Sequence, residues 1–185
     1  MGRIVYDTAV SLNGWIADEE RSLDWLFEAA GGEDPPADLL PADTAVLVEG
    51  STTYEWVLAH ERLLERPERW TELFAAKPTF VFTTRSLPVP VGADVRFVRG
   101  PVGEALPAIR AAAGEGDIWV MGGGDLAGQF LDAGALDAIA LSVAPVALTG
   151  GAPVLPRRVG SARLRLVEAR PAGPFARLLY DVLPG

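Results

Sequence analysis

Apolar and polar residues follow two patterns along the chain, and each pattern predicts one type of element. Short apolar runs predict buried strands over residues 4–10, 45–48, 79–83, 95–98, 118–121 and 138–143. Apolar residues at helical spacing predict helices from Ser22, as N-cap, to the glycines at 31–32, from 50 to 66, over 104–113 and over 124–134. Pro107 falls in the first turn of the third helix, where its missing N–H costs no hydrogen bond.

The order of these elements predicts the fold class. Strands that alternate with helices are typical of an α/β protein with helices on both faces of a mostly parallel sheet. Two alternating runs near the end, over 163–169 and 176–182, predict an antiparallel hairpin joined at 172–174. We therefore expect a three-layer α-β-α fold, one domain over residues 1–185, whose mixed sheet is mostly parallel and ends in antiparallel C-terminal strands.

Three consecutive glycines, Gly122 to Gly124, separate a predicted strand from a predicted helix. The first N–H groups of a helix have no intrahelical partner, and glycine lets a phosphate approach them, so the stretch indicates a nucleotide-like cofactor. A turn without ligand and a Rossmann dinucleotide site are the alternatives. The Rossmann pattern requires an acidic residue near the end of the next strand, and residues 141–145 contain none. A different nucleotide-binding fold agrees best with glycines so late in the chain.

Composition excludes several classes of site. The 185 residues include no cysteine, which rules out disulfides, zinc–thiolate sites and thiol nucleophiles. The single histidine, His60, rules out a histidine-rich metal centre, and its charged neighbours favour a solvated surface position over a catalytic one. A formal net charge of −9 argues against a nucleic-acid partner. Because no apolar run is long enough to span a membrane and no signal pattern is present, we expect a soluble cytoplasmic protein.

Several short segments spread along the chain form a pattern through their order and spacing. They are Ala9 to Ala17 (AVSLNGWIA), Leu23 to Trp25 (LDW), Gly50 to Tyr54 (GSTTY), the three glycines, Leu136-Asp137 leading to Pro145, and Gly150 to Leu155 (GGAPVL). Together they resemble the dihydrofolate reductase-like superfamily, in particular the reductase domain at the carboxyl end of bifunctional riboflavin-biosynthesis deaminase-reductases. The resemblance covers nearly the whole chain and implies the fold and the reductase activity of that superfamily.

The resemblance implies NADPH as the hydride donor. Its pyrophosphate would lie on the glycine turn and on the start of the helix after Gly50, its nicotinamide between Ala9 and Ile16, and its 2′-phosphate beside an arginine. The residues assigned to the cofactor in this way are Ala9, Ile16, Gly50, Ser51, Thr53, Thr83, Thr84, Arg85, Gly122, Gly123, Gly124, Asp125 and Leu126. For the segment 83–85, an ordinary polar loop is the alternative interpretation.

Three residues depart from the family pattern. Ser51 stands where family members usually carry arginine, so either Arg85 or Arg99 meets the 2′-phosphate or the preference for NADPH is weaker. Riboflavin-pathway reductases usually carry lysine at the position of Asp7 and aspartate at the position of Asn13. These last two departures argue against the pyrimidine substrate of the riboflavin pathway.

The resemblance also implies a proton donor beside the substrate. Dihydrofolate reductases place a carboxylate on the helix after the Leu-x-Trp motif; Asp24 is the nearest candidate here, and Glu28, one helical turn later, is the second. A carboxyl group in a half-buried cleft holds its proton to higher pH and can pass it to a ring nitrogen as hydride arrives at the adjacent carbon. The alternative is that Asp24 is a first-turn residue favoured by the helix dipole.

Three aromatic residues, Trp15, Trp25 and Phe27, are candidates to wall a flat substrate, although aromatic residues at this spacing also pack cores. The leading hypothesis is an NADPH-dependent oxidoreductase that transfers hydride to a small heterocyclic (pterin- or pyrimidine-like) or carbonyl substrate. The alternatives are the riboflavin-pathway 5-amino-6-(5-phosphoribosylamino)uracil reductase itself and a nucleotide-binding protein without turnover. Related domains pair through their closing strands, so the resemblance also implies a homodimer.

Overall fold

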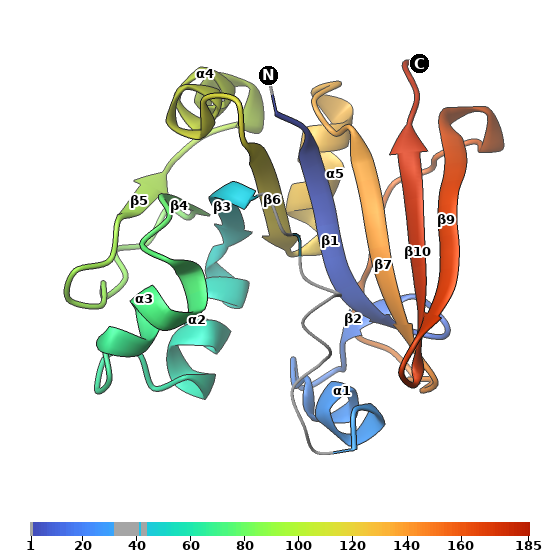
Figure 1. The fold of residues 1–185 in the computed structure, drawn as a ribbon, viewed down its shortest axis with the longest axis horizontal. Coiled ribbons are helices and arrows are strands. Elements are labelled where there is room, and N and C mark those ends of the chain that lie inside the picture. Colours follow the sequence, from blue (N-terminus) through green and yellow to red (C-terminus); the bar gives the residue numbers. More distant parts are fainter. Residues whose placement is uncertain (1, 32–40, 42–43) are drawn as a thin grey trace.

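Residues 2–31, 41 and 44–185 are described by the structure, a computed structural model (Figure 1). Its strands are β1 (Ile4–Ser11), β2 (Trp15–Ala17), β3 (Thr44–Gly50), β4 (Thr79–Phe82), β5 (Val95–Val98), β6 (Asp117–Gly122), β7 (Ala138–Ala144), β8 (Ala152–Pro153), β9 (Leu164–Ala172) and β10 (Phe175–Val182). Its helices are α1 (Asp24–Ala29), α2 (Ser51–His60), α3 (Glu68–Phe74), α4 (Val102–Ala113) and α5 (Gly124–Asp132), with a 3₁₀ turn at Ser161–Arg163.

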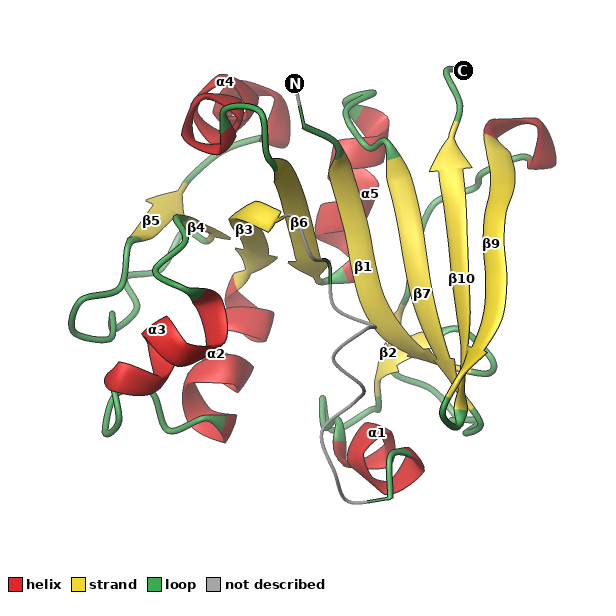
Figure 2. Ribbon diagram, in the orientation of Figure 1, coloured by secondary structure: helices red, strands yellow, loops and turns green. Residues whose placement is uncertain are grey.

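Within the described residues, eight strands form one sheet in the order β5-β4-β3-β6-β1-β7-β10-β9 (Figure 2). Neighbouring strands in the part of this order that runs from β5 through β4, β3, β6 and β1 to β7 are parallel, whereas β10 pairs antiparallel with both β7 and β9. β2 and β8 form a separate two-stranded antiparallel sheet. The predicted mixed sheet, mostly parallel with antiparallel C-terminal strands, is confirmed.

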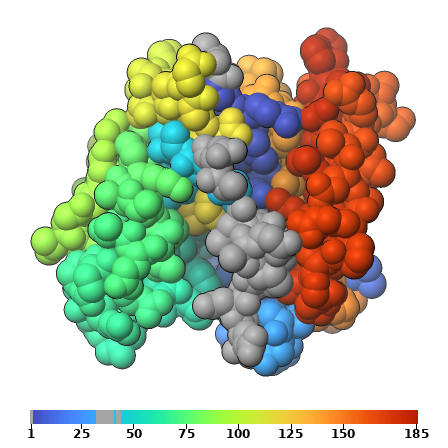
Figure 3. All heavy atoms as spheres, in the orientation of Figure 1, coloured from blue at the N-terminus to red at the C-terminus, as the bar shows by residue number. Residues whose placement is uncertain are grey.

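Helices cover both faces of the sheet, and successive residues of a strand contact opposite helix layers because their side chains point to opposite sides. Ile4, Tyr6 and Ile118 face the layer of α4 and α5, where they pack with Phe130 in the largest cluster of buried apolar side chains. On the other face Val81 packs with α2 and α3, and α1 packs over the end of β1. Figure 3 shows α2 and α3 (green) and the β9–β10 hairpin (red) on opposite sides of the molecule.

Two helices differ from their predicted ranges, and the backbone explains both differences. The helix predicted over 50–66 ends at His60 because Arg62 adopts a left-handed conformation (φ 54°), and α3 then begins after Pro67. α4 begins at Val102, so Pro107 lies in its second turn rather than its first. Pro107 and Gly103, whose carbonyl loses its helical partner there, are both exposed, so the position is open to solvent.

α1 is shorter than predicted, and Leu23 rather than Ser22 is its N-cap residue. Ser22 has a related role, because its hydroxyl oxygen accepts a hydrogen bond from the backbone N–H of Asp24 at 3.0 Å. Part of the predicted stop signal, residue 32, lies outside the described residues. No helix in the described part of the chain is long and apolar enough to cross a membrane.

Candidate functional site

A cavity of about 520 Å³ opens at the carboxyl ends of β3, β4 and β6, where ligands bind in open parallel sheets. The first turns of α2 and α5 and the small β2–β8 sheet complete its wall. Its lining residues are Thr8, Ile16, Ala17, Arg21, Leu23, Gly50, Ser51, Thr52, Thr53, Trp56, Phe82, Met121, Gly122, Gly123, Gly124, Asp125, Leu126, Gln129, Ala152, Pro153 and Pro156.

Two helix N-termini meet at this cavity. α2 begins after Gly50 and α5 after Gly123, and neither N-cap residue supplies a side-chain hydrogen bond to its helix. The two starts are close, because a Cβ built on Gly50 would lie 3.7 Å from the backbone nitrogen of Gly123. Free N–H groups and the positive ends of two helix dipoles therefore converge on one cavity, an arrangement that favours anions.

The three glycines of the turn have different surroundings. A Cβ on Gly124 would lie 2.2 Å from the carbonyl oxygen of Pro153, so this glycine allows the β8 segment to pack against α5. A Cβ on Gly123 would meet nothing nearer than the Cδ1 of Ile16, at 4.0 Å, and would project into the cavity. The peptide bond between Gly122 and Gly123 is cis. Gly124 thus serves packing, whereas Gly123 keeps the cavity open.

Hydrogen bonds fix the loop that carries Ile16 to the cavity. The amide of Asn13 accepts a hydrogen bond from the backbone N–H of Leu148 at 3.0 Å and donates one to the carbonyl oxygen of the same residue at 2.7 Å. The hydroxyl of Ser11 accepts from the backbone N–H of Trp15 at 3.0 Å. The loop after β1 is therefore tied to the segment that follows β7, and these bonds fix the chain immediately before Ile16.

Nine of the thirteen residues assigned to the cofactor line this cavity: Ile16, Gly50, Ser51, Thr53, Gly122, Gly123, Gly124, Asp125 and Leu126. Ala9 instead packs against the apolar cluster beneath α1. Several further residues of the wall were not identified from the sequence, among them Thr8, Arg21, Trp56 and Gln129. No local pattern marks these residues, because they come together only through the sheet topology.

The segment 83–85 lies beyond the cavity wall, after Phe82. The guanidinium of Arg85 is paired through both of its terminal nitrogens with the carboxylate of Glu55 on α2, and both side chains are about half exposed. The Thr83 hydroxyl accepts a hydrogen bond from the backbone N–H of Arg85 at 3.0 Å, and Thr84 is exposed. Arg85 is therefore close to α2 but already ion-paired.

The candidate acids on α1 are both exposed. Neither Asp24 nor Glu28 lines the cavity, although Leu23, immediately before Asp24, does. Trp25 is 5% exposed and belongs to the apolar cluster beneath α1, while Trp15 is half-buried on β2. The structure thus brings the start of α1 to the cavity without bringing either carboxylate into its wall.

An aromatic group links α1 to α2. The ring of Phe27 stacks on the imidazole of His60 with centroids 4.8 Å apart, and His60 stacks on Trp56 at 4.4 Å. Trp56 lines the cavity, so the group continues the cavity wall outward. His60 is 40% exposed, consistent with the predicted surface position, but it is also part of this stack.

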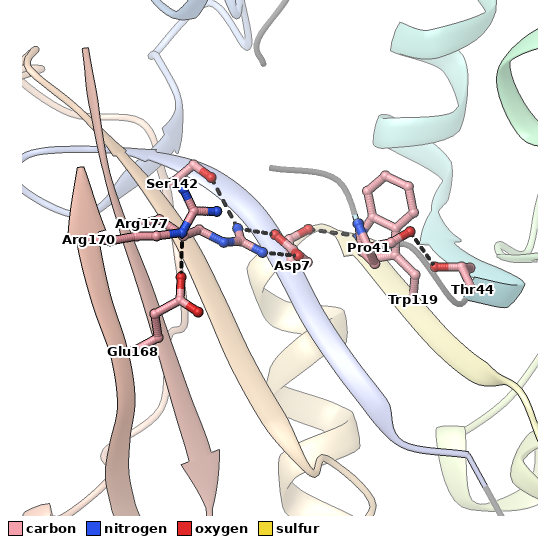
Figure 4. A network of polar contacts seen from close by, with 8 residues as sticks. All are labelled: Asp7, Pro41, Thr44, Trp119, Ser142, Glu168, Arg170 and Arg177. Carbon is pink, nitrogen blue, oxygen red and sulfur yellow. Dashed lines mark hydrogen bonds and ion pairs between the residues drawn. The ribbon is translucent and has the colours of Figure 1, made fainter. Parts of the chain in front are cut away.

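A buried ion pair crosses the sheet on the side of α1, α2 and α3 (Figure 4). The guanidinium of Arg177 donates to both carboxylate oxygens of Asp7, at 2.7 and 2.5 Å, and to the hydroxyl of Ser142 at 3.1 Å. Burial raises the pKa of the Asp7 carboxyl, and the Arg177 guanidinium opposes that rise. Since each partner satisfies the other, we interpret the pair as a structural connection between β1, β7 and β10.

Glu49, at the end of β3, is a buried acid of a different kind. It is 2% exposed, and its Oε2 atom has no hydrogen-bond partner among the described residues. Burial raises the pKa of Glu49 to about 8, so the carboxyl group is mostly protonated at neutral pH. Glu49 pairs in register with Gly122, next to the glycine turn, yet it does not line the cavity.

Comparison of the sequence with known proteins identifies a family. Residues 64–176 match the model of the RibD C-terminal domain family. Two Bacillus subtilis (strain 168) proteins are similar over 174 residues: the uncharacterized protein YwjB, 29% identical with 93% of both chains covered, and the uncharacterized protein YyaP, 26% identical with 91% of this chain and 88% of YyaP covered.

Solved structures share the fold. The putative riboflavin biosynthesis protein of Shewanella sp. PV-4 aligns over 100% of both chains with a TM-score of 0.73 and 24% identity. Dihydrofolate reductase from Enterococcus faecalis, complexed with NADP(H) and RAB-propyl, aligns over 97% of this chain and 96% of its own with a TM-score of 0.59 and 16% identity. A pyrimidine reductase-like protein of Corynebacterium diphtheriae reaches the same TM-score and identity over 100% and 93%. The family model covers more than half of the chain, so the chain belongs to the RibD C-terminal domain family, and its α/β fold is that of dihydrofolate reductase-like proteins.

Proposed function

We propose that this protein is an NADPH-dependent reductase that transfers hydride to a small heterocyclic, pterin- or pyrimidine-like, or carbonyl substrate. The observation that carries the proposal is the pair of helix N-termini, those of α2 and α5, that converge on one cavity. A dinucleotide needs such a site for its phosphates. Membership of the RibD C-terminal domain family supports a reductase, and the dihydrofolate reductase neighbour was solved with NADP(H).

The residues present fit this cofactor. The open space above Gly123 leaves room for a pyrophosphate beside the first N–H groups of α5, and Ser51 and Thr53, which carry hydroxyl groups, line the same cavity. Ile16, held by its tied loop, offers an apolar surface to the nicotinamide ring, which supplies the hydride when bound. Packing of one ring face against Ile16 would exclude water from that face and leave the opposite face for the substrate.

A second candidate function is the riboflavin-pathway reductase, which the name of the matching family favours. One buried residue argues against it. Asp7, where riboflavin-pathway reductases usually carry lysine, is a carboxylate paired with Arg177 and is not part of the cavity wall, so this position offers no cation to a substrate. We therefore favour a different small substrate for the same cofactor chemistry.

The test combines turnover with a glycine variant. Purified protein is incubated with NADPH and a panel of pterins, pyrimidines and quinones, and loss of NADPH absorbance reports turnover. Gly123→Val is expected to abolish NADPH binding in calorimetric titration, because the valine side chain would fill the cavity beside Ile16. Gly123 has φ −82° and ψ −179°, which valine adopts readily, so the variant should fold.

Gly160→Val is the matched control, because Gly160 has a similar extended backbone (φ −75°, ψ 154°) and nothing lies within 4 Å of its added Cβ. Circular dichroism checks the fold of both variants. If Gly123→Val binds NADPH as tightly as Gly160→Val does, the cofactor assignment is wrong. Binding of NADPH without oxidation by any member of the panel would favour a nucleotide-binding protein without turnover.

A further inference from the structure

Two ionisable side chains of the described residues line the cavity, and only one of them has its charge compensated. The carboxylate of Asp125 accepts hydrogen bonds from Arg157 at 3.1 Å and from Gln129 at 3.0 Å. The guanidinium of Arg21 makes no hydrogen bond or ion pair with any described residue. In a chain with a formal net charge of −9, the cavity therefore contains one uncompensated cation.

A tight turn holds Arg21 at the cavity. The backbone N–H of Arg21 donates to the carbonyl oxygen of Asp18 at 3.1 Å, and the carboxylate of Asp18 accepts from the N–H of Ser22 at 2.7 Å. Arg21 itself has φ 63°, a left-handed conformation that residues with a Cβ rarely adopt. Such conformations persist where the surroundings impose them, and they concentrate at functional sites.

The carboxylates nearest in sequence do not neutralise the guanidinium. Asp18 is engaged by the backbone of its own turn, as described. The carboxylate of Glu19 lies against Gly150, with its Oε1 only 2.5 Å from the place where a Cβ of that glycine would be. Neither makes an ion pair with Arg21 in the part of the chain that the structure describes.

The cavity wall also contains apolar and aromatic side chains. The apolar side chain of Leu23 and the flat indole ring of Trp56 line the same cavity as Arg21. Trp56 lies five residues after Ser51 on α2, which places it about 7.5 Å further along the helix axis than the phosphate-binding end. The cavity therefore offers free N–H groups at the starts of α2 and α5, and its wall also contains an aromatic side chain and an uncompensated guanidinium.

We propose that Arg21 binds an anionic group of the substrate, a carboxylate or a phosphate, so that the preferred substrate is a flat ring that carries one. This inference rests on the proposed reductase function, because it assigns the glycine turn to the cofactor and leaves Arg21 for the substrate. A guanidinium fork binds either anion through two parallel hydrogen bonds. The wall formed by Leu23 and Trp56 would contact the ring.

Matched probes test the assignment. Calorimetric titration of the protein saturated with NADP+ compares orotate with uracil, which differ by a ring carboxylate, and uridine 5′-monophosphate with uridine, which differ by a phosphate. We expect the anionic member of at least one pair to bind about 10- to 100-fold more tightly than its neutral counterpart. Arg21→Gln is expected to remove this difference, and Arg21→Lys to restore part of it.

Arg62→Gln is the control, because Arg62 is also an arginine in the left-handed conformation but lies outside the cavity. It should keep the wild-type discrimination, and Arg21→Gln should leave the Kd of NADP+ unchanged. Equal affinity for charged and neutral probes in the wild type, or discrimination that survives Arg21→Gln, overturns the proposal. Loss of NADP+ affinity in Arg21→Gln overturns it too, since the guanidinium would then serve the cofactor.

Failure of the reductase proposal has a different signature. A wild-type protein that does not bind NADP+ contradicts the cofactor assignment, and the same probe pairs are then titrated against the free protein. Discrimination that depends on Arg21 there still supports an anion site at this residue. Its absence there overturns the site independently of the cofactor.

Discussion

Replacement of Glu49 by methionine should stabilise the protein by an amount that grows with pH. Glu49 is 2% exposed at the end of β3, and no described residue hydrogen-bonds its Oε2 atom. Burial raises its pKa from 4.5 to about 8. Methionine has similar length, carries no ionisable group and adapts to the space left by a carboxyl. The variant removes both an unsatisfied polar group and a perturbed titration.

The size of the effect follows from proton linkage. Between pH 4.5 and 8 the unfolded chain has lost the proton of Glu49 while the folded protein keeps it, so the unfolded state binds fewer protons. The free energy of unfolding must then fall as pH rises, by about 1.4 kcal/mol per pH unit. From pH 5 to pH 8 the wild type should lose about 3 to 4 kcal/mol relative to Glu49→Met. Above pH 8 the folded protein also loses the proton, and the difference levels off.

Urea unfolding followed by tryptophan fluorescence at pH 5, 6, 7 and 8 measures this difference. The m-value should be equal in both proteins, so that midpoints report stability. Glu72→Met, which replaces an exposed glutamate on α3, is the control and should differ from the wild type by the same small amount at every pH. A stability difference between wild type and Glu49→Met that stays constant from pH 5 to pH 8 would refute the linkage.

Three further predictions concern the site and its assembly. Arg85→Ala is expected to weaken the binding of NADPH about 10- to 100-fold in calorimetric titration and to leave the binding of NADH nearly unchanged. Glu55→Gln, which frees the guanidinium of Arg85, should strengthen the binding of NADPH. An equal loss of affinity for both coenzymes in Arg85→Ala would place Arg85 away from the 2′-phosphate. Asp24→Asn tests the proposed proton donor, whose carboxylate is exposed and outside the cavity wall although the preceding residue, Leu23, lines it. A donor at this position predicts a loss of turnover of about 10²–10⁴-fold with little change in NADPH affinity, and turnover within a few-fold of wild type would assign the proton to Glu28 or water. Light scattering should show a homodimer, since Leu166 and Val167 on β9 are 53% and 52% exposed; a particle with the mass of one chain would contradict it.

The sequence pattern was sufficient for the sheet and for the glycine turn. Apolar runs locate strands reliably when both faces of the sheet are covered, as for β3 and β6, because their central residues, 45–48 and 118–121, are all apolar. Helix ends were less predictable. Nothing local indicates that Arg62 takes a left-handed conformation, and the apolar spacing continues past it. β2 and β8 are too short to show any period.

The residues of the candidate site likewise differ in how well the sequence predicts them. Contiguous motifs predicted that the glycine turn and the start of α2 lie at the cavity, because each motif is directly joined to the helix that it begins. Arg21 and Trp56 meet at the cavity only because the segment before α1 and helix α2 come together in the fold, and no short-range pattern encodes that. Glu49 is the reverse case. The apolar run before it predicts burial, but its charge excluded it from the predicted strand.

Asn13 shows why a departure from the family pattern need not concern the substrate. Its side chain donates to the carbonyl oxygen of Leu148 and accepts from the N–H of the same residue. An amide can do both, whereas an ionised carboxylate can only accept, so aspartate at this position would face the Leu148 carbonyl with a second acceptor. Asparagine thereby closes the loop after β1 onto the segment after β7 and holds Ile16 at the cavity wall. The identity of residue 13 is thus explained by loop architecture, and the choice of substrate is left to residues that line the cavity.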